Sequence, residues 1–166
     1  MSDQGPIRHR EQILLRLFFE HGAAERAGDV DAVMATLCDD PYYEFFPLNY
    51  RVEGTAAVRE FYARMLGANA PGSQTFRITD TSGNLGDLNS PCDVIWIGND
   101  SMVTRDDLLM TDADGRERSL RYLSIFTLKG MKLEGERIYM SQGAADYIRE
   151  SLGEDFVSLP GVSIID

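Results

Sequence analysis

Arg105 and Asp107 are the residues whose types and spacing point most clearly to chemistry. They lie two positions apart in a segment predicted to be a strand, so both side chains project from the same face. If that face lines an apolar interior, burial raises the pKa of the carboxyl group, while the guanidinium lowers it and orients the group. A carboxyl group balanced in this way can transfer protons near neutral pH. We therefore predict that Asp107 is an acid or base and that Arg105 orients it or stabilises an oxyanion.

The opposite orientation of this strand is an open alternative. Arg105 and Asp107 would then form a solvated ion pair on the outer face, and Asp106, Leu108 and Met110 would face inward. Both faces contain apolar residues, so periodicity alone does not distinguish them.

Tyr43 and His21 are predicted to add hydrogen-bond donors or a proton relay to this site. Tyr43 stands in an aromatic segment typical of a strand, where its ring can pack in the core while its hydroxyl finds a partner. His21 follows a strongly apolar helical segment, and a surface position near the end of that helix is the alternative.

A later strand supplies candidate substrate contacts. Its alternate residues form a mostly apolar inner face, which is interrupted by the hydroxyl groups of Tyr122 and Ser124. Trp96 is predicted to close part of the core or the pocket wall, and Tyr50 to cover the opening from a loop. Such residues suit a flat, hydrophobic ligand.

The elements that must position these residues follow from hydrophobic periodicity and from breaker residues. Apolar residues at helical spacing predict helices over 7–20, with good helix formers up to 28, then over 29–37 and 55–66. Strands are predicted over 42–46, 75–81, 93–97, 101–111, 119–129 and 132–141, and a short helix over 146–152. This order indicates an α+β fold in which three helices pack on a curved, cone-shaped sheet around a pocket.

The composition is that of one domain and disfavours several kinds of partner. With 166 residues, of which 43% are hydrophobic, the chain can bury one core, placed at about 7–142, and leaves a tail over 143–166. The net charge of −11 disfavours binding to nucleic acid or to an anionic membrane. No segment is typical of a signal peptide or of a membrane span, so we expect a cytoplasmic protein.

The sequence shows no spacing typical of a metal or cofactor site. Its two histidines lie far apart, and Cys38 and Cys92 have the spacing of neither metal ligands nor a disulfide framework. No glycine-rich phosphate loop follows a predicted strand. We therefore predict no metal and no cofactor.

Three short motifs follow one another in the N-terminal third of the chain: Ala-Gly-Asp-Val-Asp at 27–31, Asp-Asp at 39–40 and Val-Glu-Gly at 52–54. Their order resembles the SnoaL-like (NTF2-like) family, which includes ketosteroid isomerases, polyketide cyclases and limonene-epoxide hydrolase. The resemblance implies a hydrophobic pocket for a small molecule, and a homodimer. The sheet face with Leu123, Ile125 and Tyr139, which is too apolar for open solvent, is the expected dimer interface.

Longer motifs favour the epoxide-hydrolase branch of that family. Residues 43–48 resemble its Tyr-x-Asn-x-Pro-Leu strand, residues 103–108 its Arg-x-Asp strand, and residues 137–139 its Arg-Asp-Tyr segment. This resemblance implies that Tyr43 and the pair of Arg105 and Asp107 line the active site.

Two departures from that pattern argue against simple epoxide hydrolysis. Phe45 replaces the Asn that binds the attacking water, and Ile138 replaces the second catalytic Asp. In a comparison with the ketosteroid isomerases, the catalytic Tyr of that family falls on His21, its general-base Asp on Phe45 and its oxyanion-hole Asp on Ser124. The isomerase set is therefore not retained either.

These residues lead to one main functional prediction and two alternatives. We predict a cofactor-independent enzyme that uses acid–base catalysis on a small, hydrophobic, cyclic or aromatic oxygenated compound, as a lyase, isomerase or cyclase. The predicted substrate contacts are Phe45, Tyr50, Trp96, Tyr122, Ser124 and Ile138. The alternatives are a non-catalytic binding module, which has no need to bury a charged pair such as Arg105 and Asp107, and a modified epoxide hydrolase.

Overall fold

In the described residues, 8–66, 77–78, 92–111 and 117–165, the computed structural model has four α-helices and one eight-stranded mixed sheet. The helices are α1 (His9–Ala27), α2 (Val30–Thr36), α3 (Thr55–Leu66) and α4 (Gln142–Leu152), and a short 3-10 helix, η1 (Phe156–Ser158), follows them. The strands are β1 (Leu37–Phe46), β2 (Tyr50–Glu53), β3 (Arg77–Ile78), β4 (Cys92–Ile97), β5 (Ser101–Thr111), β6 (Glu117–Lys129), β7 (Lys132–Met140) and β8 (Val162–Ile164). The predicted α+β class is confirmed.

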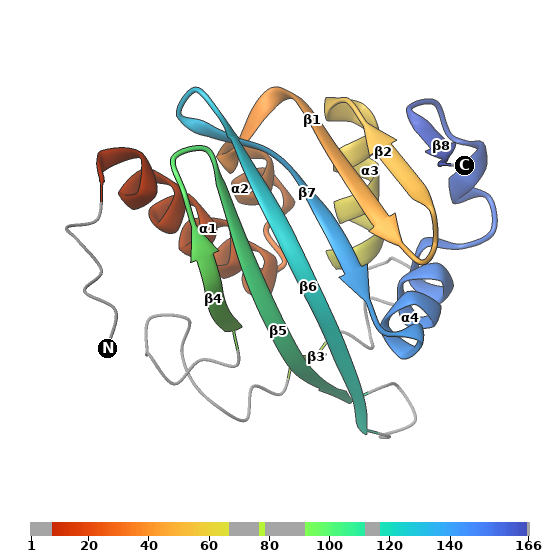
Figure 1. The fold of residues 1–166 in the computed structure, drawn as a ribbon. Coiled ribbons are helices and arrows are strands. Elements are labelled where there is room, and N and C mark those ends of the chain that lie inside the picture. The colour runs from red at the N-terminus through yellow and green to blue at the C-terminus, as the bar shows by residue number, and fades with distance from the viewer. Residues whose placement is uncertain (1–7, 67–76, 79–91, 112–116, 166) are drawn as a thin grey trace.

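The sheet has the strand order β3-β5-β6-β7-β1-β2-β8, and β4 also pairs with β5. The pair β1–β7 is parallel, whereas β5–β6 and β6–β7 are antiparallel. Figure 1 shows the curved sheet in front, with α1, α2 and α3 behind it. The predicted strand over 75–81 is described only at its two central residues.

The first helix is longer than its apolar pattern. Glycine at position 22 does not end α1, which continues to Ala27 and stops at Gly28, whose φ of 67° suits glycine. Asp29 then caps α2, because its Oδ1 accepts a hydrogen bond from the backbone N–H of Ala32 at 2.9 Å. As a result His21 lies inside a helix instead of at its end, and its side chain is only 2% exposed.

The inner face of the sheet, which packs on the helices, carries three cross-strand rows of side chains. The rows are Met102–Phe126–Glu136–Tyr43–Val52, Thr104–Ser124–Ile138–Phe45–Tyr50 and Asp106–Tyr122–Met140. The first row is fully buried, the second is partly buried, and every member of the third is half-buried. Solvent therefore reaches the inner face at the third row.

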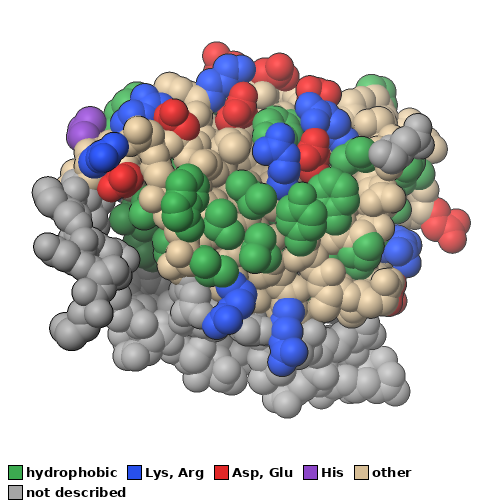
Figure 2. Space-filling view, in the orientation of Figure 1, with side chains coloured by type: hydrophobic (Ala, Val, Ile, Leu, Met, Phe, Trp, Pro, Cys, Tyr) green, Lys and Arg blue, Asp and Glu red, His purple; other side chains and the backbone are tan. Residues whose placement is uncertain are grey.

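The outer face of the same strands is apolar over a broad area. Leu123 and Ile125 on β6 are half-buried there, and Tyr139 on β7 is 45% exposed and stacks on Phe46 with ring centroids 4.9 Å apart. Figure 2 shows hydrophobic side chains gathered across the middle of this face, with charged side chains above them. An apolar sheet face is thus present, as the sequence indicates.

The C-terminal tail folds back on the third helix. The Arg64 guanidinium on α3 forms an ion pair with Asp155 at 2.8 Å and donates to the backbone carbonyl of Leu152. Phe156 is fully buried, and β8 extends the sheet by pairing with β2. The tail therefore closes the core beside α3 and completes one edge of the sheet.

Candidate functional site

A group of hydrogen-bonded side chains joins three helices to the sheet; we name His21, Thr36, Tyr62 and Tyr43 the His21 cluster. The His21 Nδ1 lies 2.7 Å from Thr36 Oγ1 on α2, and its Nε2 lies 2.9 Å from the Tyr62 hydroxyl on α3. Tyr62 donates to the Tyr43 hydroxyl on β1 at 2.9 Å, and that hydroxyl is 3.4 Å from His21 Nε2. All four side chains are buried.

Glu25 connects the His21 cluster to the protein surface. It lies one helical turn after His21, with Oε1 3.4 Å from Nε2, and its side chain is 37% exposed. Burial raises the pKa of Glu25, but the charge of His21 and the nearby polar groups of His21 and Tyr62 outweigh this effect, so the pKa lies below its usual value. Glu25 is therefore an anion in contact with the ring.

Glu136 on β7 is a buried carboxyl group beside this cluster. It lies next to Tyr43 on the neighbouring parallel strand and is 7% exposed. Burial raises its pKa well above the usual range, the charges of Glu25 and Asp106 raise it further, and the nearby Ser124 hydroxyl lowers it in part. Glu136 therefore retains its proton to a higher pH than an ordinary glutamate.

Three polar groups lie beyond Glu136 on β5 and β6. Ser124 is 1% exposed, and its Oγ makes no hydrogen bond of normal geometry among the described residues. It is nevertheless close enough to Glu136 to lower the pKa of that carboxyl group. Thr104 donates to Asp106 Oδ2 at 3.2 Å. Because a buried hydroxyl without a partner costs free energy, Ser124 is a ready hydrogen-bonding group for a ligand.

The two tyrosines of the cluster are neutral hydrogen-bonding groups. Burial raises the pKa of Tyr43 well above its usual value, and the charge of Glu136 adds to this effect. Burial likewise raises the pKa of Tyr62, with further contributions from Tyr43 and Glu25. Both phenols can donate protons to hydrogen bonds, but neither ionises near neutral pH.

Several residues predicted from the sequence do come together on the inner face. Tyr43 and His21 meet in the His21 cluster, and the surface alternative for His21 is excluded by its burial. The predicted substrate contacts Phe45, Tyr50, Tyr122, Ser124 and Ile138 lie in the second and third rows of the inner face. Tyr50 differs in one respect, because it begins β2 and does not lie in a loop.

Other predicted residues lie elsewhere. On β5, Met102 and Thr104 are fully buried on the inner face, and Arg105 is exposed on the opposite face. The side chain of Asp107 lies outside the described part of the structure. Trp96 pairs with Val103 and is 53% exposed, so it does not close the core.

Over the described side chains of β5, up to Asp106, the strand thus has the alternative orientation, with Met102, Thr104 and Asp106 on the inner face. Asp106, one residue from the predicted Asp107, occupies the inner face next to Tyr122. Neighbouring residues of a strand lie on opposite faces. The match to the Arg-x-Asp motif therefore pointed to the face that carries Arg105, which is the outer one.

Sequence reasoning missed the carboxyl groups of Glu25 and Glu136 and the Tyr62 hydroxyl. Glu25 is four residues after His21, a spacing that places both on one side of a helix. Glu136 is two residues before Ile138 and therefore shares its strand face. Both signals were present, but they acquire meaning only once the inward-facing residues are known.

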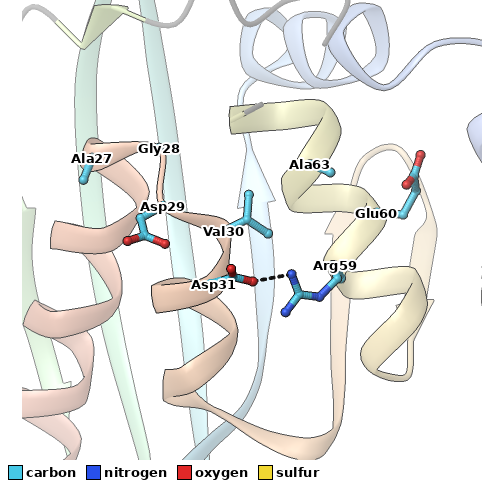
Figure 3. Close-up of a pocket in the computed structure, with 8 residues that line it drawn as sticks. All are labelled: Ala27, Gly28, Asp29, Val30, Asp31, Arg59, Glu60 and Ala63. Atoms are coloured by element: carbon cyan, nitrogen blue, oxygen red, sulfur yellow. Dashed lines mark hydrogen bonds and ion pairs between the residues drawn. The ribbon is translucent and has the colours of Figure 1, made fainter. Parts of the chain in front are cut away.

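A shallow hollow at the surface lies away from these residues, between α2 and α3 (Figure 3). It is lined by Ala27, Gly28, Asp29, Val30, Asp31, Arg59, Glu60 and Ala63. Its charged side chains already have partners within the protein. Asp29 caps α2, Asp31 forms an ion pair with Arg59 at 2.6 Å, and Glu60 pairs with Arg64 at 2.8 Å. Over the described ranges, no group of three histidine, cysteine or acidic side chains is arranged to hold a metal ion.

Comparison with known families identifies the fold. The sequence model of the SnoaL-like domain matches residues 15–134, which is most of the chain. The chain belongs to the SnoaL-like family. No curated protein sequence matches this SnoaL-like chain significantly.

Solved structures agree with this assignment at low sequence identity. An NTF2-like protein from Burkholderia xenovorans has a TM-score of 0.61 and 15% identity to this SnoaL-like chain, covering 87% of it and 100% of the neighbour. A "putative polyketide cyclase" from Xanthomonas campestris pv. campestris also has a TM-score of 0.61, with 18% identity over 86% and 98% of the two chains. A "putative isomerase" from Bacillus subtilis has a TM-score of 0.58, with 13% identity over 81% and 90%. These likenesses show the NTF2-like fold.

The described helices of this SnoaL-like chain include none with the length and apolar character needed to cross a membrane.

Proposed function

We propose that this protein is a cofactor-independent acid–base enzyme that isomerises or cyclises a small, hydrophobic, oxygenated molecule. One observation carries the proposal: the carboxyl group of Glu136 is buried on the inner face and has a raised pKa. It lies beside Tyr43 and the Ser124 hydroxyl, which has no hydrogen-bond partner among the described residues. Burying a carboxyl group costs several kcal/mol unless it is compensated, so a site that does so favours proton transfer over passive storage.

The chemistry assigned to these groups is protonation and hydrogen bonding of a substrate oxygen. Glu136 in its protonated form donates to that oxygen, and in its ionised form it is a stronger base than an ordinary carboxylate, because its pKa is raised. Ser124 and Tyr43 supply further hydrogen bonds. Phe45 and Ile138 flank these groups with apolar surface, which suits a hydrophobic ring.

This proposal changes the residue expected to transfer the proton. Because Arg105 is exposed, we assign proton transfer to Glu136 and not to the pair of Arg105 and Asp107. Asp106 is the second carboxyl group on the inner face. The names of two structural neighbours, "putative polyketide cyclase" and "putative isomerase", agree with proton-transfer chemistry of this class. Lyase chemistry uses the same acid and base and remains within the proposal.

A non-catalytic binding module is the second candidate. The outward position of Arg105 favours it, because an exposed guanidinium does not belong to a buried site such as the one expected of an enzyme. A modified epoxide hydrolase is a third option, and it requires a bound water that Phe45 and Ile138 cannot hold. The buried groups Glu136 and His21 favour the enzyme over both.

We also propose that two copies of the chain associate through the outer face of the sheet. The exposed ring of Tyr139 and the half-buried Leu123 and Ile125 form an apolar surface of the kind that monomers rarely leave open. A twofold axis would place the same patch of each copy against the other.

Hydrogen exchange at carbon provides a test that does not require the natural substrate. Cyclic and aromatic ketones are incubated with the protein in D2O, and loss of the signals of hydrogens next to the carbonyl is followed by NMR. We expect exchange of at least one compound, and we expect Glu136→Gln to slow it by about 100-fold or more. A parallel incubation with epoxides tests for diol formation.

The control variant is Glu134→Gln, on the same strand two residues away, where the carboxylate lies 3.9 Å from Lys129 Nζ and is partly exposed. We expect this variant to exchange at the wild-type rate. Binding of ketones without exchange would support the binding module, and equal rates in Glu136→Gln and wild-type protein would remove Glu136 from the mechanism.

A further inference from the structure

The hydrogen bonds of the His21 cluster have a direction, because each hydroxyl group has a single proton to donate. Thr36 Oγ1 donates its proton to the backbone carbonyl of Val33 at 2.7 Å. Towards His21 it can therefore only accept, so Nδ1 of the ring carries a proton and donates to Thr36 over 2.7 Å.

The count of hydroxyl protons also determines the state of the other ring nitrogen, Nε2. Tyr62 donates its proton to the Tyr43 hydroxyl, so its oxygen must accept from His21 Nε2, which lies 2.9 Å away. Nε2 then also carries a proton. A ring that donates from both nitrogens is an imidazolium cation, and the carboxylate of Glu25, 3.4 Å from Nε2, is its counterion.

The direction of the hydrogen bonds in the His21 cluster determines whether the Tyr43 hydroxyl is a donor or an acceptor towards the inner face. Because Tyr43 accepts from Tyr62, and Nε2 already carries a proton, the Tyr43 proton is not used within the cluster. It can be donated towards the inner face, where Glu136 lies on the adjacent strand. With a neutral ring the bonds would reverse, since Tyr43 would donate to Tyr62 and Tyr62 to Nε2, leaving Tyr43 as an acceptor.

We propose that Glu25 is a positioning residue that keeps His21 protonated on both nitrogens and thereby makes Tyr43 a hydrogen-bond donor to the molecule bound on the inner face. The consequence for ligand binding rests on the proposed function, whereas the state of the ring does not. The groups that face the ring are Glu25 from α1, Thr36 from α2, Tyr62 from α3 and Tyr43 from β1, with Glu136 on β7 behind Tyr43. Glu25 is the carboxylate in contact with it.

The test reads the protonation of the ring directly in the ligand-free protein. Long-range 1H–15N NMR spectra of 15N-labelled protein at pH 7 distinguish ring nitrogens that carry a proton from those that do not. The chain has two histidines, so a His9→Gln variant assigns the signals. We expect both nitrogens of His21 to be protonated in the wild-type protein, and Nε2 to lose its proton in Glu25→Gln, with a large downfield shift.

The matched control is Glu20→Gln on the same helix, where the carboxylate pairs with Arg16 at 2.9 Å and not with His21. We expect it to leave both His21 nitrogens protonated. An unprotonated Nε2 in the wild-type protein would overturn the proposal, even if Glu25→Gln does not fold, and so would a Glu25→Gln ring that keeps both protons.

The ring signals also separate this inference from the proposed function. If His21 behaves as expected but no compound exchanges hydrogen or binds, the proposed enzyme fails and the role of Glu25 towards the ring stands. If compounds exchange hydrogen while His21 is neutral, the proposed enzyme stands and the role of Glu25 towards the ring fails.

Discussion

The two faces of the sheet are built from alternate residues of the same strands, yet their charged side chains have different partners. On the outer face, Glu44 accepts hydrogen bonds from Arg51 at 2.5 Å and from Arg137 at 2.8 Å. Both guanidinium groups also lie over the ring of Tyr42, at 4.9 and 5.1 Å from its centroid. Charge on this face is paired directly, in contact with solvent.

On the inner face, the carboxyl group of Glu136 has Glu25 and Asp106 as its charged neighbours, and its pKa is raised. The outer arrangement stabilises ionised groups, whereas the inner one stabilises a protonated acid. This difference indicates that the outer charges serve structure, and that the inner carboxyl group is maintained at a cost which a functional role explains.

The largest expected difference between the faces concerns aromatic packing. Phe45 is fully buried and contacts Tyr43 and Phe61, with ring centroids 6.1 and 4.9 Å away. We expect Phe45→Ala to lower the free energy of unfolding by about 3–5 kcal/mol. Tyr139→Ala on the outer face should cost about 1 kcal/mol, because that ring is already half exposed.

Urea denaturation at low protein concentration measures both values. A cost for Tyr139→Ala equal to that of Phe45→Ala would mean that the outer face is as much a core as the inner one, and the comparison would then no longer hold.

The sequence was sufficient to predict the α+β class, the order of most elements, although not the short strands β2 and β8, and most of the inner row that contains Phe45 and Ser124. These depend on periodicity and on breaker residues, which act locally. The face presented by β5 was not predicted, because both of its faces contain apolar residues and a shift of one position exchanges them. Arg105 therefore lies outside and Asp106 inside.

The partners of the candidate site were the hardest part to predict. Tyr62 reaches Tyr43 from 19 positions along the chain, and His21 from 22. Such contacts depend on how α1 and α3 pack on the sheet, which local patterns do not specify. The glycine after His21 is a poor helix former, so local propensity places His21 near the end of a helix. Tertiary packing instead carries α1 past this glycine to Ala27.

The next largest effect is the pH dependence of stability. The folded protein holds the Glu136 proton above the usual pKa of 4.5, whereas the unfolded chain releases it there, so the folded state binds more protons. Stability contributed by this group is therefore present below about pH 4.5 and is lost as the pH rises, by at most about 1.4 kcal/mol per pH unit. Glu136→Gln cannot ionise and should gain stability relative to the wild-type protein as the pH increases from 4.5 to 8.

Glu134→Gln is again the control, because its carboxylate lies on the same strand near Lys129. Urea denaturation at several pH values should give parallel curves for this variant and the wild-type protein, and diverging curves for Glu136→Gln. Parallel curves for Glu136→Gln as well would show that Glu136 is ionised in the folded protein at little cost.

The smallest effect on folding, and the one most specific to the outer face, is expected for Leu123→Lys. This residue is half-buried on the apolar outer face, so a charge there should change the free energy of unfolding by less than about 1 kcal/mol in the monomer. If two copies associate through this face, the same charge should separate them, because it would be desolvated in the interface. Sedimentation velocity over a range of concentrations measures the association.

Met131→Lys provides the matched control, since Met131 is an apolar residue that is 54% exposed in the turn between β6 and β7. We expect it to associate like the wild-type protein, whereas Leu123→Lys should be monomeric. If the wild-type protein is itself monomeric at every concentration, or if both variants remain dimeric, the outer face is not the contact between copies. The paired charges of Glu44, Arg51 and Arg137 would then keep their structural role on that face without a second copy of the chain.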